Sequence, residues 1–214
     1  NITLDETTIH FRGGDLLKFG HKAYGFLRFD AYKSVIQEFH NNTPPASIGI
    51  VTQTFGGNTG EHRKADMKGS HHHRILVTAL RDHLQKVFPS TRITIHSEDP
   101  MPLSYARMIL SHQTIGAFSS FAVFPAIATF GTGYLRYPKR SGPYQWLVNS
   151  KQRANLVWFE AEDILRPSVL QYVWRNLGLE VLLKWLRGDI TTAELKALVV
   201  VYTRQSNGTL AKAA

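Results

Sequence analysis

The chain has 214 residues, and its hydrophobic content of 43% supplies enough apolar material for a packed core and argues against a disordered protein. Its formal charge is +9, from 25 Lys and Arg against 16 Asp and Glu, which predicts an anionic partner: a nucleic acid, a membrane surface or a phosphorylated molecule. Cysteine is absent, which excludes disulfides and cysteine-based zinc sites.

Short β-rich runs alternate with longer helical patterns through most of the chain. Strands are predicted at Thr8–Phe11, Ile48–Thr52, Arg92–His96, Thr114–Ala117, Gly133–Tyr137 and Leu156–Phe159. Helices are predicted at Phe29–Phe39, Ser70–Phe88, Leu103–Ser111 and Phe121–Phe130. Connections of this length favour parallel strands, so the expected fold is α/β, a doubly wound parallel sheet with helices on both faces.

The C-terminal part has a different pattern. A long helical pattern runs from Pro167 to Leu186 and is stopped by Gly188. Thr191 and Glu194 have the spacing of a capping box that opens a last helix through about Thr203, and the tail after it is expected to be frayed. We therefore expect a nucleotide-binding domain over residues 1–165 and a C-terminal helical extension over 166–214 that packs on it.

The first predicted strand ends in the sequence HFRGGD, residues 10–15. In a doubly wound sheet, ligands bind outside the carboxyl ends of the strands, and Arg12 lies at such an end. Gly13 and Gly14 let the backbone approach a ligand, and Asp15 can hold the arginine by a charged hydrogen bond. The turn is either an anion site or an ordinary turn with a surface arginine.

A second candidate lies in the segment AFSSFAVFPA, residues 117–126. A strand precedes Ser119 and Ser120, and an apolar helix follows them. Hydroxyls and unpaired backbone N–H groups therefore gather at a helix N-terminus, which attracts anions. Simple capping of the helix by serine is the alternative interpretation.

Taken together, the two segments resemble the fucosyltransferase superfamily, which includes α1,6-fucosyltransferases, nodulation-type enzymes and protein O-fucosyltransferases. HFRGGD is similar to its H-x-R-x-x-D motif, and the Phe118-Ser119-Ser120 segment to its FSS motif. The resemblance covers about Thr8 to Gly133 and implies a Rossmann-like fold, the donor-binding half of a two-domain GT-B glycosyltransferase. An acceptor domain is then expected on the N-terminal side.

The resemblance also implies roles for individual residues. Arg12 would hold the diphosphate of a nucleotide sugar, with Asp15 orienting it and His10 lining the nucleotide pocket. Ser119, Ser120 and Phe121 would donate hydrogen bonds to the phosphates. Positive charge placed against the leaving diphosphate is a strong catalytic contribution, so no metal or other cofactor is required.

Two positions depart from the family pattern. Ser104 stands where these enzymes often carry an aspartate that recognises guanine, so a GDP-sugar donor is expected but not fixed. After Asp15, the relatives have lysine and glutamate where this chain has Leu16 and Gly20. The catalytic base is therefore sought on the acceptor domain, or on Asp30 or Glu98.

Cations and aromatic side chains also alternate near the fifth predicted strand, in the order Tyr134, Arg136, Tyr137, Lys139, Arg140 and Tyr144. This alternation is typical of proteins that bind single-stranded nucleic acid, although a solvated loop rim explains it equally well. His71, His72 and His73 point in different directions on a helix, so the surface of a basic helix start, or an engineered remnant, is preferred to a metal site.

Sequence signals for the compartment are weak. No apolar run approaches the ~18 residues that cross a bilayer, and glycosylation sequons at Asn1, Asn41 and Asn207 favour the lumen of the secretory pathway, such as the Golgi. The chain opens without methionine or a leader, which indicates a mature form or an excised fragment.

The leading hypothesis is an inverting, fucosyltransferase-like glycosyltransferase that moves a sugar from a nucleoside diphosphate to a hydroxyl of a glycan or protein. The alternative is a non-catalytic module with a basic surface that binds nucleic acid or carbohydrate.

Overall fold

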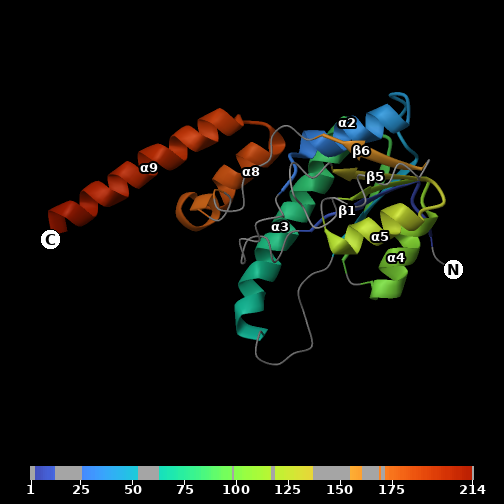
Figure 1. Ribbon diagram of the computed structural model, residues 1–214, viewed down its shortest axis with the longest axis horizontal. Coiled ribbons are helices and arrows are strands. Elements are labelled where there is room, and N and C mark those ends of the chain that lie inside the picture. The colour runs from blue at the N-terminus through green and yellow to red at the C-terminus, as the bar shows by residue number, and fades with distance from the viewer. Residues whose placement is uncertain are drawn as a thin grey trace.

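The computed structural model describes residues 3–12, 26–52, 63–97, 99–116, 119–136, 155–160, 169 and 172–213, the side chains of 63–70, 120 and 204–213 excepted. Its centre is a sheet of six strands (Figure 1). They are β1 (Thr7–His10), β2 (Ser47–Val51), β3 (Arg92–His96), β4 (Gln113–Gly116), β5 (Thr132–Arg136) and β6 (Leu156–Phe159).

All neighbouring strands are parallel, in the order β3-β2-β1-β4-β5-β6. This is the strand order of a Rossmann-like doubly wound fold, so the predicted fold class is confirmed. The central strands β1, β2 and β4 are buried along their whole length, as expected for a parallel sheet covered on both faces.

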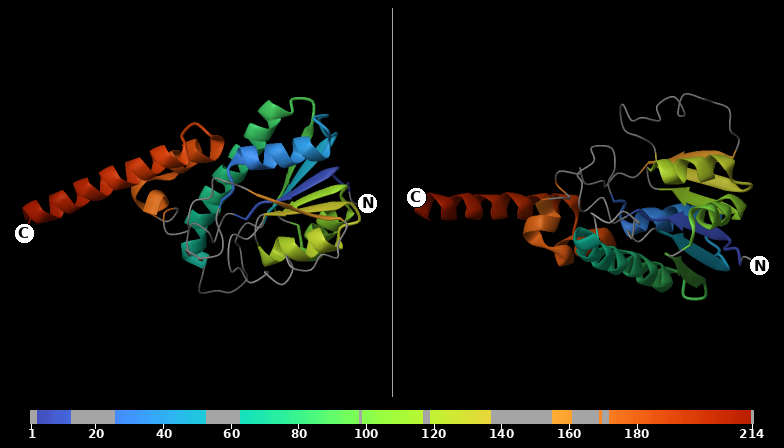
Figure 2. Two further views of the ribbon diagram at one scale, coloured as in Figure 1. Left: turned by 45° about the horizontal axis from the view of Figure 1, so that its top comes forward. Right: turned by 90° about the horizontal axis from the view of Figure 1, so that it is seen from below.

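Helices cover both faces of the sheet (Figure 2). The helices of the described residues are α2 (Phe29–Phe39), α3 (Arg63–Val87), α4 (Met101–Leu110), α5 (Ser120–Ala128), the π-helix η1 (Val173–Leu177), α8 (Leu179–Arg187) and α9 (Thr192–Ala213). The face under α2, α3 and α8 holds the larger apolar core, which includes Ile9, Ile36, Leu80 and the fully buried Trp185. Under α5, Val123, Ala126 and Leu135 form a separate small cluster.

The C-terminal helices differ in how they join the rest. Helix α8 packs into the larger core through Leu182, Leu183, Trp185 and Leu186, and Gly188 ends it with a φ of 90°, a conformation that favours glycine. Helix α9 then projects away from the sheet, and the C-terminus lies far from the N-terminus (Figures 1 and 2).

Three sequence-based boundaries are wrong. Helix α3 begins at Arg63, before the predicted Ser70, because its first residues are good helix formers although its apolar stripe starts only at Ile75. Gly178, with a φ of 86°, divides the helical pattern after Pro167. Helix α9 continues to Ala213, where a frayed tail was expected. No helix among the described residues is long and apolar enough to cross a membrane.

Candidate functional site

The strand order reverses between β1 and β4, at the centre of the sheet. The chain leaves β1 towards β2 on one side and leaves β4 towards β5 on the other, so the connections diverge and a crevice can open between the two carboxyl ends. His10 and Gly116 are paired in register at those ends. The predicted phosphate-binding residues lie on the segments that follow these two strands.

His10 and Phe121 bring the two segments together. The centres of the two rings are 5.0 Å apart with 27° between their planes, which is a stacked arrangement. His10 is the last residue of β1 and is buried, and Phe121 lies in the first turn of α5. The end of β1 and the N-terminus of α5 therefore meet at the switch point, although more than a hundred residues separate them in the chain.

Ser119 caps α5. Its backbone is extended, its side chain is fully buried, and its Oγ accepts a hydrogen bond of 3.2 Å from the backbone N–H of Phe121. Capping, the plainer of the two interpretations of this serine, is thus present. A hydroxyl that accepts one hydrogen bond can still donate another, and the positive end of the helix dipole remains beside it. The side chain of Ser120 lies outside the described residues.

Ser104 and Tyr105 place the start of α4 next to this junction. The Tyr105 ring meets the Phe121 ring edge-on, with centres 4.8 Å apart. The Ser104 hydroxyl is buried and makes no hydrogen bond to any described residue. A buried hydroxyl without a partner costs about 1–3 kcal/mol, so a ligand atom or a water is expected to satisfy it.

Arg12 lies two residues beyond β1 and is partly exposed. The preceding residue, Phe11, extends the pairing with β2: its N–H donates to the carbonyl of Val51 at 2.9 Å, and its own carbonyl accepts from the Thr52 hydroxyl at 2.7 Å. The backbone is therefore fixed up to the residue before Arg12. Gly13, Gly14 and Asp15 lie outside the described residues, so the pairing of Asp15 with Arg12 stays a prediction.

His73 supports the same strand ends and was misread from the sequence. Its Nε2 lies 2.5 Å from Thr52 Oγ1, and the side chain is 1% exposed. It sits well inside α3, where a basic helix surface or an engineered remnant was expected. The useful signal was its place on the apolar stripe, three residues before Leu76 and seven before Leu80.

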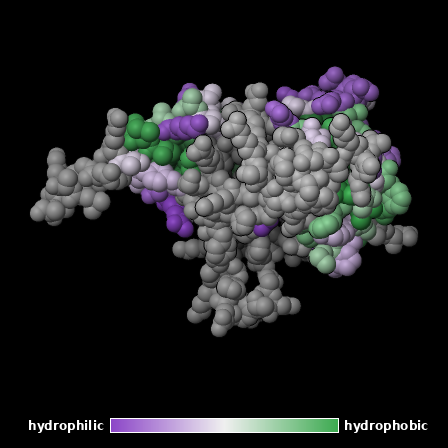
Figure 3. All heavy atoms as spheres, in the orientation of Figure 1, coloured by the Kyte–Doolittle hydropathy of each residue, from purple (hydrophilic) through white to green (hydrophobic). Residues whose placement is uncertain are grey.

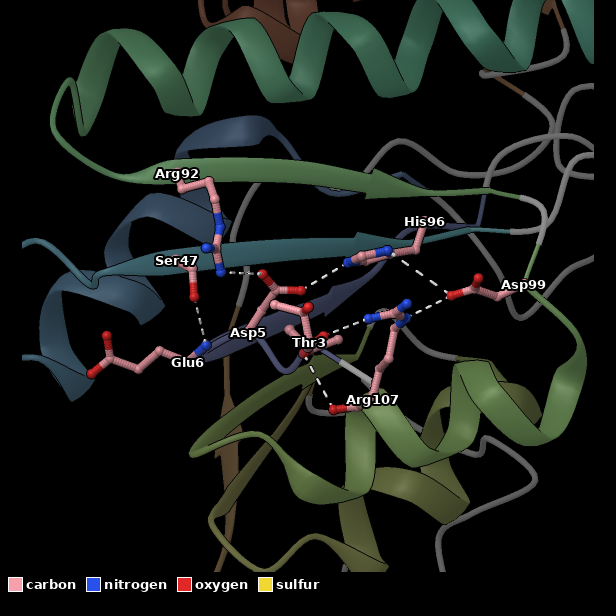
Figure 4. Close-up of polar contacts among 9 residues, drawn as sticks. Thr3, Asp5, Glu6, Ser47, Arg92, His96, Asp99 and Arg107 are labelled. Atoms are coloured by element: carbon pink, nitrogen blue, oxygen red, sulfur yellow. Dashed lines mark hydrogen bonds and ion pairs between the residues drawn. The ribbon is translucent and has the colours of Figure 1, made fainter. Parts of the chain in front are cut away.

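A partly buried polar network lies under α4, and sequence reasoning missed it (Figure 4). His96 Nε2 is 2.8 Å from Asp5 Oδ2, and Arg107 Nε donates to Asp99 Oδ2 at 2.6 Å. Arg107 Nη1 also donates to the carbonyl of Thr3 at 2.7 Å. The network fastens α4, and with it Ser104 and Tyr105, to the sheet.

Gly49 makes room for this network. A Cβ atom at this position in β2 would lie 2.3 Å from Asp5 Oδ2, so only glycine lets the carboxylate pack against the backbone of the strand. An acidic residue just before a buried strand, together with a glycine inside the neighbouring strand, is the signal that could have predicted the contact.

Of the alternating cations and aromatic side chains near β5, the two that the structure describes do not form a surface stripe. Tyr134 and Arg136 are buried on β5, and the Tyr134 ring packs edge-on against Phe39. Burial lowers the pKa of Arg136, an effect that Tyr32 opposes, and raises the pKa of Tyr32. Tyr137, Lys139, Arg140 and Tyr144 lie outside the described residues.

The described residues contain no group of three His, Asp or Glu side chains placed to hold a metal ion. Comparison of the chain with known proteins gives no match to a family model, to a curated protein or to a solved structure. The case for a function therefore depends on the residues at the switch point.

Proposed function

We propose that the chain is the donor-binding half of an inverting, fucosyltransferase-like glycosyltransferase of GT-B architecture. The observation that carries the proposal is the stacking of His10 on Phe121, because it brings the end of β1 next to the start of α5, from which the two predicted phosphate-binding segments extend, at the switch point of the sheet. The diphosphate of a nucleotide sugar would lie between Arg12 and the N-terminus of α5.

The reaction would be a direct displacement at the anomeric carbon. An acceptor hydroxyl loses its proton to a base and attacks that carbon, the glycosidic bond to the diphosphate breaks, and the anomeric configuration inverts. Negative charge grows on the departing diphosphate. Arg12 and the positive end of the α5 dipole would stabilise that charge, and Asp15 would orient the arginine.

The nucleobase would lie near Ser104, whose buried hydroxyl has no partner among the described residues. A hydroxyl both donates and accepts hydrogen bonds, whereas the carboxylate of the related enzymes only accepts. GDP is the first nucleotide to test, and UDP the second. The base and the acceptor, a glycan or a protein, are assigned to an N-terminal acceptor domain.

A compartment in the secretory pathway, such as the Golgi lumen, is part of the proposal. It is supported by the sequon at Asn41, which is exposed in the turn after α2 and has a φ of 50°. A glycosylated site needs such an exposed position.

Calorimetry with GDP and with UDP tests the proposal. One of the two nucleotides should show saturable binding, and Arg12→Ala should abolish it while the circular dichroism spectrum is unchanged. Lys86→Ala is the control, because it removes an exposed cation from the last turn of α3. This turn leads into the start of β3, whereas Arg12 follows the carboxyl end of β1. Flat titrations of the folded wild type with both nucleotides would refute the assignment.

The alternative function gives a different result in the same assay. A non-catalytic module with net charge +9 would bind oligonucleotides with an affinity that falls steeply as salt rises, and GDP would compete poorly. The burial of Tyr134 and Arg136 removes part of the surface on which that alternative depended.

A further inference from the structure

A groove of about 610 Å³ lies between α2 and the edge strand β6, on the other face of the sheet from Phe121. Its apolar lining comes from Ala31 and Val35 of α2 and from Val157 and Phe159 of β6. In a doubly wound sheet, a helix normally covers this position beside the last strand. The position of the groove and its apolar lining are therefore those of a surface on which a helix can pack.

The rim of this groove is acidic. Among the described residues that line it, Asp30, Glu38 and Glu160 supply three carboxylates against the single cation of Arg28, a formal charge of −2. The chain as a whole carries +9. An apolar floor with an acidic rim is complementary to a helix that has one apolar face and a net positive charge.

Helix α9 has these properties. Leu198, Val201 and Tyr202 follow helical spacing along one side and are 45%, 52% and 37% exposed. The sequence of α9 contains Lys196, Arg204 and Lys212 against Glu194 alone, a formal charge of +2. Figure 3 shows hydrophobic residues on the surface of the arm that α9 forms. Such a stripe on a projecting helix is a usual mark of an interaction site.

The α9 helix is fixed in a direction that leads away from the groove of its own chain. Leu195 is fully buried, the Trp185 indole N–H donates to Thr192 Oγ1 at 2.9 Å, and Tyr172 bonds to Thr203 at 2.7 Å. Turning α9 back onto its own body would break all three contacts. A second molecule can reach the stripe without breaking any of them.

We propose that α9 of one molecule docks in the α2–β6 groove of a second copy of the chain. Every copy has one stripe and one groove, so reciprocal docking closes a twofold dimer in which both apolar surfaces are buried. The association uses the face of the sheet opposite Phe121 and is independent of the proposed transferase activity.

The mass in solution, measured by light scattering after gel filtration, tests the dimer. At tens of micromolar, the wild type should have twice the mass of one chain, and Val201→Glu should have the mass of a single chain. Val200→Glu is the matched control, because Val200 is 49% exposed but lies outside the stripe, and it should leave the dimer intact. A monomeric wild type, or equal effects of the two variants, would overturn the proposal.

Changes on the groove side identify the binding surface. Glu38 and Glu160 are exposed, so Glu38→Arg with Glu160→Arg should leave the fold intact and weaken dimerisation by about tenfold or more. Mixing this variant with Val201→Glu should give a complex, because one partner has an intact helix and the other an intact groove. A groove variant that dimerises like the wild type would show that α9 packs elsewhere, and the groove assignment would be wrong.

Discussion

The sheet face under α4 and α5 is held together in two different ways. Beneath α4, charged and polar side chains join β1, β3 and the helix: Asp5, His96, Asp99 and Arg107. Beneath α5, the contacts are apolar and close, between Val123, Ala126 and Leu135. His10, Phe121 and Ser104 lie where the two halves meet. The comparison indicates that the polar half sets the position of α4, the apolar half sets how near α5 approaches, and the placement of these three residues depends on both.

The largest expected effect tests the apolar half. A Cβ at Gly133 would lie 2.1 Å from the backbone oxygen of Ala126, so Gly133→Ala should push α5 from the sheet and cost about 3 kcal/mol or more in the free energy of unfolding. Urea denaturation measures it. Gly116→Ala is the milder comparison: its nearest atoms, in the side chains of Ala122 on α5 and of Leu135, lie at 2.8 Å, so α5 has less far to move and the cost should be smaller. A Gly133→Ala variant as stable as the wild type would show that α5 can move freely.

The next effect tests the polar half. Asp5 is 4% exposed, and its carboxylate lies against His96. Asp5→Asn removes this buried charge and leaves His96 without its ionic partner, so it should cost about 3 kcal/mol in the free energy of unfolding. Asp82→Asn breaks the exposed pair with Arg81 and should cost no more than about 1 kcal/mol. If the two variants unfold at the same urea concentration, the network under α4 contributes nothing to stability.

A smaller effect concerns the boundary between the two halves. Ser119→Ala removes the cap of α5 and should cost about 1 kcal/mol, and it should also weaken nucleotide binding in calorimetry. Thr191→Ala removes the cap of α9, where Thr191 and Glu194 form the predicted capping box. It should cost a similar amount and leave nucleotide binding unchanged. Loss of binding in both variants would mean that capping acts only through overall stability.

The smallest effect is on the pH dependence of stability, and it concerns the opposite face of the sheet, where His83 lies near Asp30. Burial lowers the pKa of His83, an effect that Asp30 opposes. Below its ordinary pKa of about 6.5, the unfolded chain then binds more protons than the folded one, so stability falls as the pH drops through that value. Denaturation midpoints at about pH 7.5 and about pH 5.5 should differ less in His83→Gln than in the wild type.

Periodicity and turn chemistry predicted all six strands to within one residue at each end, because runs such as Ile48–Thr52 are short, β-branched and bounded by turn residues. The site was predicted only at the level of segments: His10 and Phe121 were named, but not their stacking. Contacts between distant residues follow from strand order, which local patterns do not contain. The role of His73 and the network around Asp5 were missed for that reason.

The central position of the first strand has a consequence for the time at which the switch point of the sheet forms during synthesis. β1, β2 and β3 are complete once His96 has been made, yet the other edge of β1 has no neighbour until β4 is added. The switch point between β1 and β4 therefore joins the earlier-made part of the protein to the later one. A nucleotide bound across the junction would tie the two parts together and slow their separation, so it should protect the chain from proteases most strongly between β3 and β4.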